Sequence, residues 1–196
     1  MGIEAHPEPS PDLATCDLPI TEMHCRWYRI HRLTREAIFF GKRNDNRFDA
    51  PKGEFGVLYV GESKAAAFIE TFGQNTGYAF VQKSELSSRS LSIIESSRPL
   101  KLVDLTASGL AKIGADNRLC DGDRALSGRW SGALHANFTL PDGLYYRARH
   151  DPSECCAAIF DRTNAVLQST DSICMSKDSL SGELLTLLSR YRFGWI

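Results

Sequence analysis

From residue 25 onward, short strand-like segments follow one another with only a few helical segments between them. They are rich in β-branched and aromatic residues and are bounded by Gly, Pro, Asn or Ser, as is typical of strands that pair in a sheet. We expect strands at residues 25–31, 57–60, 77–82, 91–94, 100–103, 143–149 and 155–160. The sequence therefore predicts one mixed α/β or α+β domain, with a β-sheet core flanked by helices.

Helical spacing of apolar residues appears in four segments, which we expect at residues 64–72, 107–113, 124–137 and 180–191. The first has the clearest ends, because Ser63 is a suitable N-cap and Gly73 stands where a C-cap is expected. Glu70 then lies near the end of this helix.

The N-terminal segment has a different composition. Residues 1–20 contain four of the eight prolines and few large apolar side chains, so they cannot form a core of their own. We expect a flexible arm at residues 1–20 and a single domain at residues 21–196, with no internal repeat.

Charge and hydropathy exclude several classes of function. The 23 basic and 24 acidic residues give a net charge of -1, so no excess of positive charge draws the chain to nucleic acid or to a membrane surface. No apolar run reaches the roughly 18 residues of a membrane span, and no secretory signal is recognisable. We expect a cytoplasmic protein that binds neither nucleic acid nor membrane.

Metal and nucleotide motifs are missing from the sequence. The six cysteines include no Cys-x-x-Cys pair, and the five histidines never fall at the spacing of a helical zinc site, so we expect reduced thiols and no metal. Neither a Walker phosphate loop nor a G-x-G-x-x-G turn occurs, which argues against those two kinds of nucleotide site.

Three polar residues occur in an order that favours a common cleft. Arg47 lies in a long polar loop at residues 41–56, Tyr59 lies on the next strand, and Glu70 lies on the helix after it. Each alone is typical of an ordinary loop, sheet or helix residue. Together they indicate a site, because a long loop, a strand end and a helix end can converge.

Several motifs in this order resemble the RES domain, a family named for its Arg, Glu and Ser and known from toxins of RES–Xre toxin–antitoxin pairs. The matching segments are WYRI at residues 27–30, NRFDAP at 46–51, FGVLYVGES at 55–63, AAAFIET at 65–71, DGLYYRARHDP at 142–152 and AIFDR at 158–162. They cover most of the chain from residue 25 onward.

The resemblance implies a fold similar to ADP-ribosyltransferases and an enzyme that degrades NAD, releasing nicotinamide by phosphorolysis or hydrolysis. NAD is then a substrate, and no cofactor is implied. The matching catalytic positions are Arg47, Tyr59 and Glu70, and those that contact substrate include Tyr28, Arg29 and Arg149. The resemblance also implies an Xre-type helix-turn-helix antitoxin as partner, and a homodimer is left open.

The chemistry of NAD cleavage suits these residue types. Breaking the nicotinamide–ribose bond creates a ribosyl cation, which the carboxylate of Glu70 would stabilise. Diphosphate, or inorganic phosphate as the acceptor, calls for planar guanidinium donors such as Arg47 and Arg29. Tyr59 could stack on nicotinamide. Nicotinamide leaves as a neutral molecule, so no general acid is required.

The sequence departs from the family at one position. The family's serine is expected where Ala148 stands, so we place Ala148 at the edge of the substrate pocket without its hydroxyl. Either Ser131 or Ser153 replaces that hydroxyl, or the activity is weakened, or the natural sequence was altered.

Two other functions share these features. An ADP-ribosyltransferase would transfer ADP-ribose from NAD to a macromolecule, although the Glu-x-Glu and Gln-x-Glu motifs of its arginine-modifying members are absent. A catalytically inactive binding module would keep the pocket, with Ala148 as a sign of decay.

Overall fold

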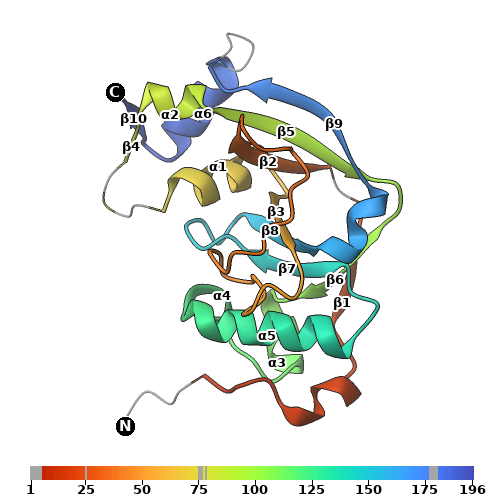
Figure 1. Cartoon of the computed structure of the whole chain (residues 1–196). Helices are drawn as coiled ribbons and strands as arrows, with labels where there is room; N and C mark the ends of the chain where they lie inside the picture. The colour runs from red at the N-terminus through yellow and green to blue at the C-terminus, as the bar shows by residue number, and fades with distance from the viewer. Residues whose placement is uncertain (1–5, 25, 75–76, 78, 177–180) are drawn as a thin grey trace.

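An eight-stranded sheet organises the chain in the computed structural model, which describes residues 6–24, 26–74, 77, 79–176 and 181–196 (Figure 1). The strand order is β1-β6-β7-β8-β3-β2-β5-β9, in which β6 and β7 run parallel and the other neighbours run antiparallel. The strands are β1 (Ile20–Met23), β2 (Trp27–Arg32), β3 (Val57–Gly61), β5 (Arg89–Ser96), β6 (Leu100–Asp104), β7 (Gly143–Arg147), β8 (Cys155–Phe160) and β9 (Leu167–Cys174). A small second sheet pairs β4 (Phe80–Val81) with β10 (Gly194–Trp195).

Helices flank the sheet in two groups. The parallel strands β6 and β7 need a crossover connection, and α3 (Ala107–Lys112), α4 (Arg118–Asp121) and α5 (Arg124–Asn137) provide it. In Figure 1 they lie together below the sheet, whereas α1 (Lys64–Phe72), α2 (Lys83–Ser87) and α6 (Ser181–Arg190) gather near β2 and β5. Two short 3-10 helices, η1 (Pro11–Thr15) and η2 (Asp161–Val166), complete the set. The predicted α+β class is confirmed.

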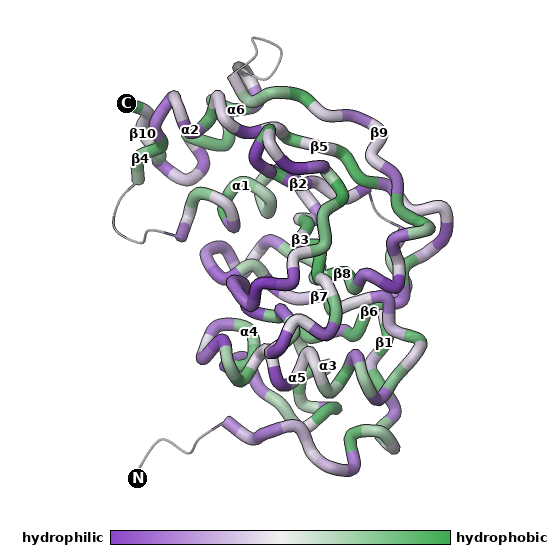
Figure 2. The backbone as a smooth tube through the Cα atoms, viewed as in Figure 1, coloured by the Kyte–Doolittle hydropathy of each residue, from purple (hydrophilic) through white to green (hydrophobic). Residues whose placement is uncertain are grey.

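The core has three clusters that follow this division. One packs α5 against β7 and β8, with Trp130, Leu144 and Phe160 among its members. Another packs α1, α2 and α6 against β2 and β5, and a third surrounds the fully buried Trp27. The central strands β3 and β8 are mostly hydrophobic, whereas β9 at the sheet edge carries a long hydrophilic stretch (Figure 2).

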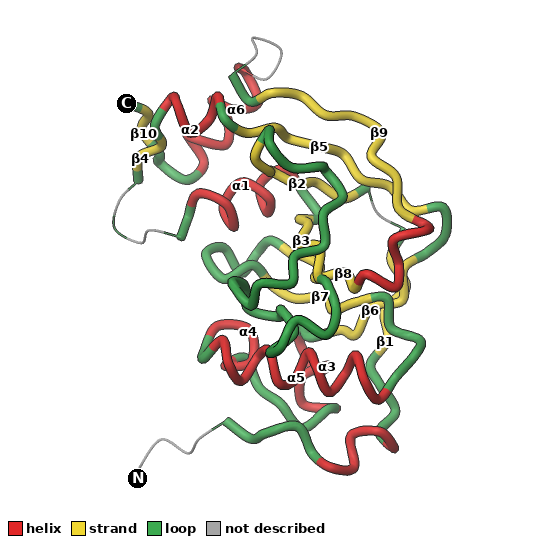
Figure 3. Tube along the Cα trace, viewed as in Figure 1, coloured by secondary structure: helices red, strands yellow, loops and turns green. Residues whose placement is uncertain are grey.

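The sheet opens between β2 and β3. These strands are paired at one position, Tyr28 opposite Gly61, whereas β2 is paired with β5 along its whole length. The two halves of the sheet therefore diverge beyond Tyr28. The loop at residues 33–56 joins the diverging strands and extends toward α5 (Figure 3).

The predicted elements are largely confirmed, and the differences follow from side-chain pattern. The helix expected at residues 64–72 has the predicted bounds, and Ser63 caps it through a hydrogen bond from the Ala66 amide. The strand expected at 143–149 ends at Arg147, and that expected at 77–82 is shortened to β4. Strands β1, β9 and β10 were not predicted, because short or polar strands lack apolar alternation. Cys25, Tyr78 and Leu180, at the edges of predicted elements, lie outside the described residues.

The described part of the expected N-terminal arm packs on the domain. The Trp130 indole donates to the Pro7 carbonyl at 3.0 Å, Arg129 pairs with Glu8, and Leu13 is fully buried. The division into an arm at residues 1–20 and a domain at 21–196 stays a prediction. Within the described residues, no helix combines the length and apolar character that crossing a membrane requires.

Candidate functional site

A cavity of about 520 Å³ lies where β2 and β3 diverge. Its walls come from β2, β3 and α1, together with the loop at residues 33–56 and the chain that follows β7. Six residues predicted from sequence line this one cavity: Tyr28, Arg29, Arg47, Tyr59, Glu70 and Arg149. The structure therefore brings together side chains from positions 28 to 149.

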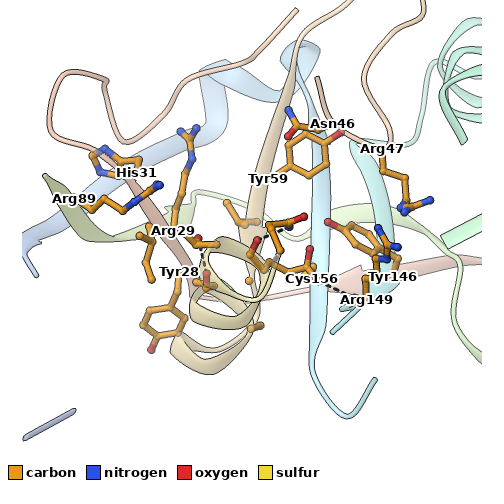
Figure 4. Close-up of a pocket in the computed structure, with 18 of the residues that line it drawn as sticks. Tyr28, Arg29, His31, Asn46, Arg47, Tyr59, Arg89, Tyr146, Arg149 and Cys156 are labelled. Atoms are coloured by element: carbon orange, nitrogen blue, oxygen red, sulfur yellow. Dashed lines mark hydrogen bonds between the residues drawn. The ribbon is translucent and has the colours of Figure 1, made fainter. Parts of the chain in front are cut away.

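The cavity is strongly cationic. Among the described residues that line it, seven are arginines and one, Glu70, is acidic. In Figure 4, Arg29 and Arg89 lie on one side of Tyr59, and Arg47 and Arg149 lie on the other. The lining arginines are Arg29, Arg32, Arg35, Arg47, Arg89, Arg124 and Arg149. Such a site suits a ligand with phosphate groups, because guanidinium donates two parallel hydrogen bonds to phosphate.

Glu70 owes its position to the helix that carries it. Gly61 lets β3 lie against the first turn of α1, because a side chain there would meet the Ala67 amide at 2.5 Å. At the other end of α1, the Arg149 backbone amide donates to Glu70 Oε1 at 2.7 Å. The carboxylate is therefore held against the chain that follows β7, with its second oxygen left for a ligand.

Arg47 is fixed by its contact with a distant part of the chain. Its guanidinium donates to the carbonyl of Gly122, the C-cap of α4, at 2.8 Å, which ties the loop to the end of α4. Burial and the nearby guanidinium of Arg149 lower the pKa of Arg47. Arginine stays charged at neutral pH even after such a shift, so both guanidinium groups remain available to an anion.

Asp49, which the sequence did not single out, folds the segment that carries Arg47. Its buried carboxylate accepts hydrogen bonds from the Asp45 and Asn46 amides, each at 3.0 Å. It also accepts a hydrogen bond from the hydroxyl of Tyr59 at 2.9 Å. The phenol oxygen of Tyr59 in turn accepts from the Phe48 amide at 2.9 Å. Asp49 therefore joins the Arg47 loop to β3.

The hydroxyl of Tyr59 is fully engaged, which leaves its ring for contact with a ligand. Burial and the carboxylate of Asp49 raise the pKa of Tyr59 well above its ordinary value. The phenol therefore stays protonated and is unsuited to act as a base at neutral pH. Stacking of the ring on a planar group remains compatible with this geometry.

Arg29 lies on the other side of the cavity. Its guanidinium donates to the Ala37 carbonyl at 2.5 Å, and burial, with Arg35 nearby, lowers its pKa to about 10. The neighbouring Tyr28 ring lies 5.9 Å from the Lys64 ammonium. Arg29 thus connects the cavity to the loop that follows β2.

Ala148 does not lie where the sequence predicted it. The residue is 1% exposed and packs in the core beneath α5, and it does not contribute to the walls of the cavity. Neither expected substitute faces the cavity: the Ser131 hydroxyl is buried and donates to the Phe48 carbonyl, and the Ser153 hydroxyl donates to Asp151. The placement of Ala148 at the pocket edge is wrong, because its side chain is buried in a core cluster.

Other lining residues were not predicted. His31 was accessible to sequence reasoning, because it lies two residues from Arg29 and shares its face of β2. Arg89 and Arg124 carried no local signal, since they come from β5 and α5. Cys120 and Cys156 also reach the cavity, and burial raises the pKa of Cys120 to about 12 and that of Cys156 well above its ordinary value, so both stay as thiols.

The opened eight-stranded sheet and its flanking helices define an α+β fold with a cationic cavity. The chain belongs to the RES domain family, whose family model matches residues 26–178. No curated protein matches the sequence. Among solved structures, the chain is similar to one in the "Crystal structure of the M.tuberculosis MbcT-MbcA toxin-antitoxin complex", with a TM-score of 0.59, 18% identity, and coverage of 79% of this chain and 85% of that one.

Proposed function

We propose that this protein is the toxin of a toxin–antitoxin pair and that it degrades NAD by cleaving the bond between nicotinamide and ribose. The observation that carries the proposal is the cavity that seven arginines and the carboxylate of Glu70 line together. Membership of the RES domain family supports the same reading. A dinucleotide has two phosphates and a ribose at which positive charge develops, and the cavity offers a complementary group for each.

Glu70 would stabilise the transition state. Cleavage of the nicotinamide–ribose bond builds positive charge on the ribose, and a fixed carboxylate lowers the energy of that cation. The hydrogen bond from the Arg149 amide holds Glu70 in place. The oxygen that does not take part in it would face the ribose or one of its hydroxyl groups.

The remaining residues would bind and orient the substrate. Nicotinamide departs as a neutral ring and needs no proton from the protein. This agrees with the raised pKa of Tyr59, whose phenol does not readily release its proton. The Tyr59 ring would stack on nicotinamide, and guanidinium groups such as those of Arg47 and Arg29 would hold phosphates. Inorganic phosphate or water would then capture the ribosyl cation.

The partner would be an antitoxin. The similar solved structure is that of a toxin–antitoxin complex, and the family resemblance implies an Xre-type helix-turn-helix protein in that role. We expect such a partner to suppress the loss of NAD when it is added to the purified toxin.

The decisive experiment incubates the pure protein with NAD, with and without phosphate, and identifies the products by mass. Free nicotinamide with ADP-ribose 1-phosphate would indicate phosphorolysis, and nicotinamide with ADP-ribose would indicate hydrolysis. Intact NAD at high enzyme concentration would contradict the proposal and favour a binding module. ADP-ribose attached to an added protein or nucleic acid would instead support an ADP-ribosyltransferase.

A further inference from the structure

A second cavity of about 490 Å³ adjoins the one that contains Glu70. It lies between the loop that follows β2 and the ribbon formed by β5 and β9. His31 and Arg35 line both cavities, so the two share a wall. The remaining residues around the second cavity are Leu33, Glu36, Ala37, Ile38, Ser90, Asn164, Ser169 and Ser172.

The wall between the cavities is held by hydrogen bonds on both sides. Arg29, from the first cavity, donates to the carbonyl of Ala37, which belongs to the second. His31 Nε2 lies 2.8 Å from the hydroxyl of Ser92, which donates to the Ser172 hydroxyl at 2.8 Å. The junction therefore carries two arginines and a histidine on a framework that exists before any ligand binds.

The second cavity differs chemically from the first. Away from His31, Arg35 and Glu36, its walls consist of serine hydroxyls, the Asn164 amide and aliphatic side chains. Hydroxyl and amide groups both donate and accept hydrogen bonds, as the edges of a purine and the hydroxyls of a ribose require. Aliphatic side chains such as Ile38 offer an apolar surface to the faces of a base.

We propose that the second cavity binds the adenosine half of the dinucleotide, with the diphosphate crossing the junction at Arg29 and Arg35. The assignment of NAD as the dinucleotide rests on the proposed function. NAD consists of two nucleosides joined by a diphosphate, and the structure has two cavities of similar size joined by cationic side chains. The nicotinamide riboside then lies beside Glu70.

The test uses adenosine 5'-monophosphate (AMP) as the probe, because it contains the nucleoside and one phosphate but no nicotinamide. We expect AMP to bind the pure protein, as measured by calorimetry. Ser169→Trp fills the second cavity from β9, and we expect it to weaken AMP binding at least tenfold. Thr170→Trp is the matched control, since the neighbouring Thr170 is exposed but does not line the cavity. Circular dichroism and thermal unfolding check that both variants fold.

A second variant keeps the proposal testable if Ser169→Trp fails to fold. Arg35→Ala removes the cation at the junction, so we expect it to weaken AMP binding without weakening adenosine binding to the same degree. Failure of wild-type protein to bind AMP, or equal AMP affinity in wild type and in folded Ser169→Trp and Arg35→Ala, would overturn the proposal.

Kinetics separate this proposal from the proposed function. If the protein cleaves NAD, Ser169→Trp should lower the ratio of kcat/KM for NAD to kcat/KM for nicotinamide mononucleotide at least tenfold, because the mononucleotide has no adenosine. An unchanged ratio would contradict the second cavity as the adenosine site. If NAD is not cleaved at all, AMP binding still tests the role of the cavity, and only the proposed function fails.

Discussion

Among the described residues that line the cavity, one is acidic, and that residue is Glu70. Its role in NAD cleavage can be tested directly by removing its charge. Glu70→Gln keeps the oxygen that accepts from the Arg149 amide but removes the charge. We expect NAD cleavage to fall by about 100-fold or more with the fold intact, since a fixed charge at a developing cation contributes several kcal/mol. Turnover of NAD and thermal unfolding measure both effects. Glu22→Gln on exposed β1 is the control, and near-normal turnover in Glu70→Gln would remove Glu70 from the mechanism.

Arg47 tests whether guanidinium geometry matters beyond charge. One of its nitrogens is already engaged by the Gly122 carbonyl, so any phosphate must use the rest of the planar group. Lysine cannot hold the carbonyl and present two parallel donors at once. We therefore expect Arg47→Lys to lower kcat/KM for NAD roughly tenfold or more. Arg43→Lys, exposed on the same loop, should behave as wild type, and unchanged kinetics in Arg47→Lys would assign Arg47 to loop structure alone.

Ala148 shows how burial reverses an expectation from sequence. A serine at the pocket edge would have added a hydrogen bond to substrate, but the residue is 1% exposed. We now expect Ala148→Ser to lower the free energy of unfolding by about 1–3 kcal/mol, because its hydroxyl is buried among apolar side chains. Chemical denaturation checks this, with exposed Ala136→Ser as the control. Faster NAD cleavage in Ala148→Ser would show that the hydroxyl reaches the cavity after all.

At the scale of elements, the close contact of β3 with α1 determines where α1 places Glu70 relative to the other residues of the cavity. A Cβ at Gly61 would lie 2.5 Å from the Ala67 amide nitrogen and 2.8 Å from the Ala66 Cβ. Gly61→Ala must therefore push α1 outward, at a cost of about 1–3 kcal/mol in stability. We expect a lower Tm together with reduced NAD turnover.

Gly182→Ala in α6 is the matched control, because its Cβ would meet nothing within 4 Å. It should keep the wild-type turnover and leave Tm unchanged or slightly higher, since alanine favours helix. Wild-type turnover in Gly61→Ala would mean that the position of α1 does not govern the site.

At the scale of the whole molecule, Asp142 joins three parts of the fold. Its carboxylate accepts two hydrogen bonds of 2.7 Å from Arg98 and one of 2.8 Å from the Lys101 amide, and it lies 3.2 Å from the Thr163 hydroxyl. Burial favours the neutral acid, but the bonds from Arg98 and Lys101 prevail and lower the pKa of Asp142. The charged carboxylate therefore stabilises the folded state.

The sign of the pH dependence follows from this lowered pKa. The contribution of Asp142 is fully present above its unfolded pKa of about 4 and is lost as pH falls through the lower folded value. We expect Asp142→Asn to reduce the free energy of unfolding by roughly 1.5–3 kcal/mol at pH 7, and the deficit to shrink below about pH 4. Denaturant titrations at several pH values measure it, with exposed Asp17→Asn as the control. A deficit that does not change with pH would contradict the role of the charge.

Much of the fold could be predicted from sequence because its signals are local. Strands β3 and β8 and helices α1 and α5 appear at or within one residue of their expected ends, since caps and apolar periodicity act over a few residues. The edge strand β9 was missed, because its polar side chains carry no alternation and its place depends on pairing with β5.

Local residue patterns alone specify the helix that carries Glu70 and the order of Arg47, Tyr59 and Glu70, because neighbouring residues set these features. Tertiary contacts, in contrast, bring Arg89 and Arg124 to the same cavity and keep Ala148 out of it. They also create the second cavity that shares a wall with the first. The physical reason is that β2 and β3 diverge after one paired position, and this divergence depends on strand register between segments far apart in the chain.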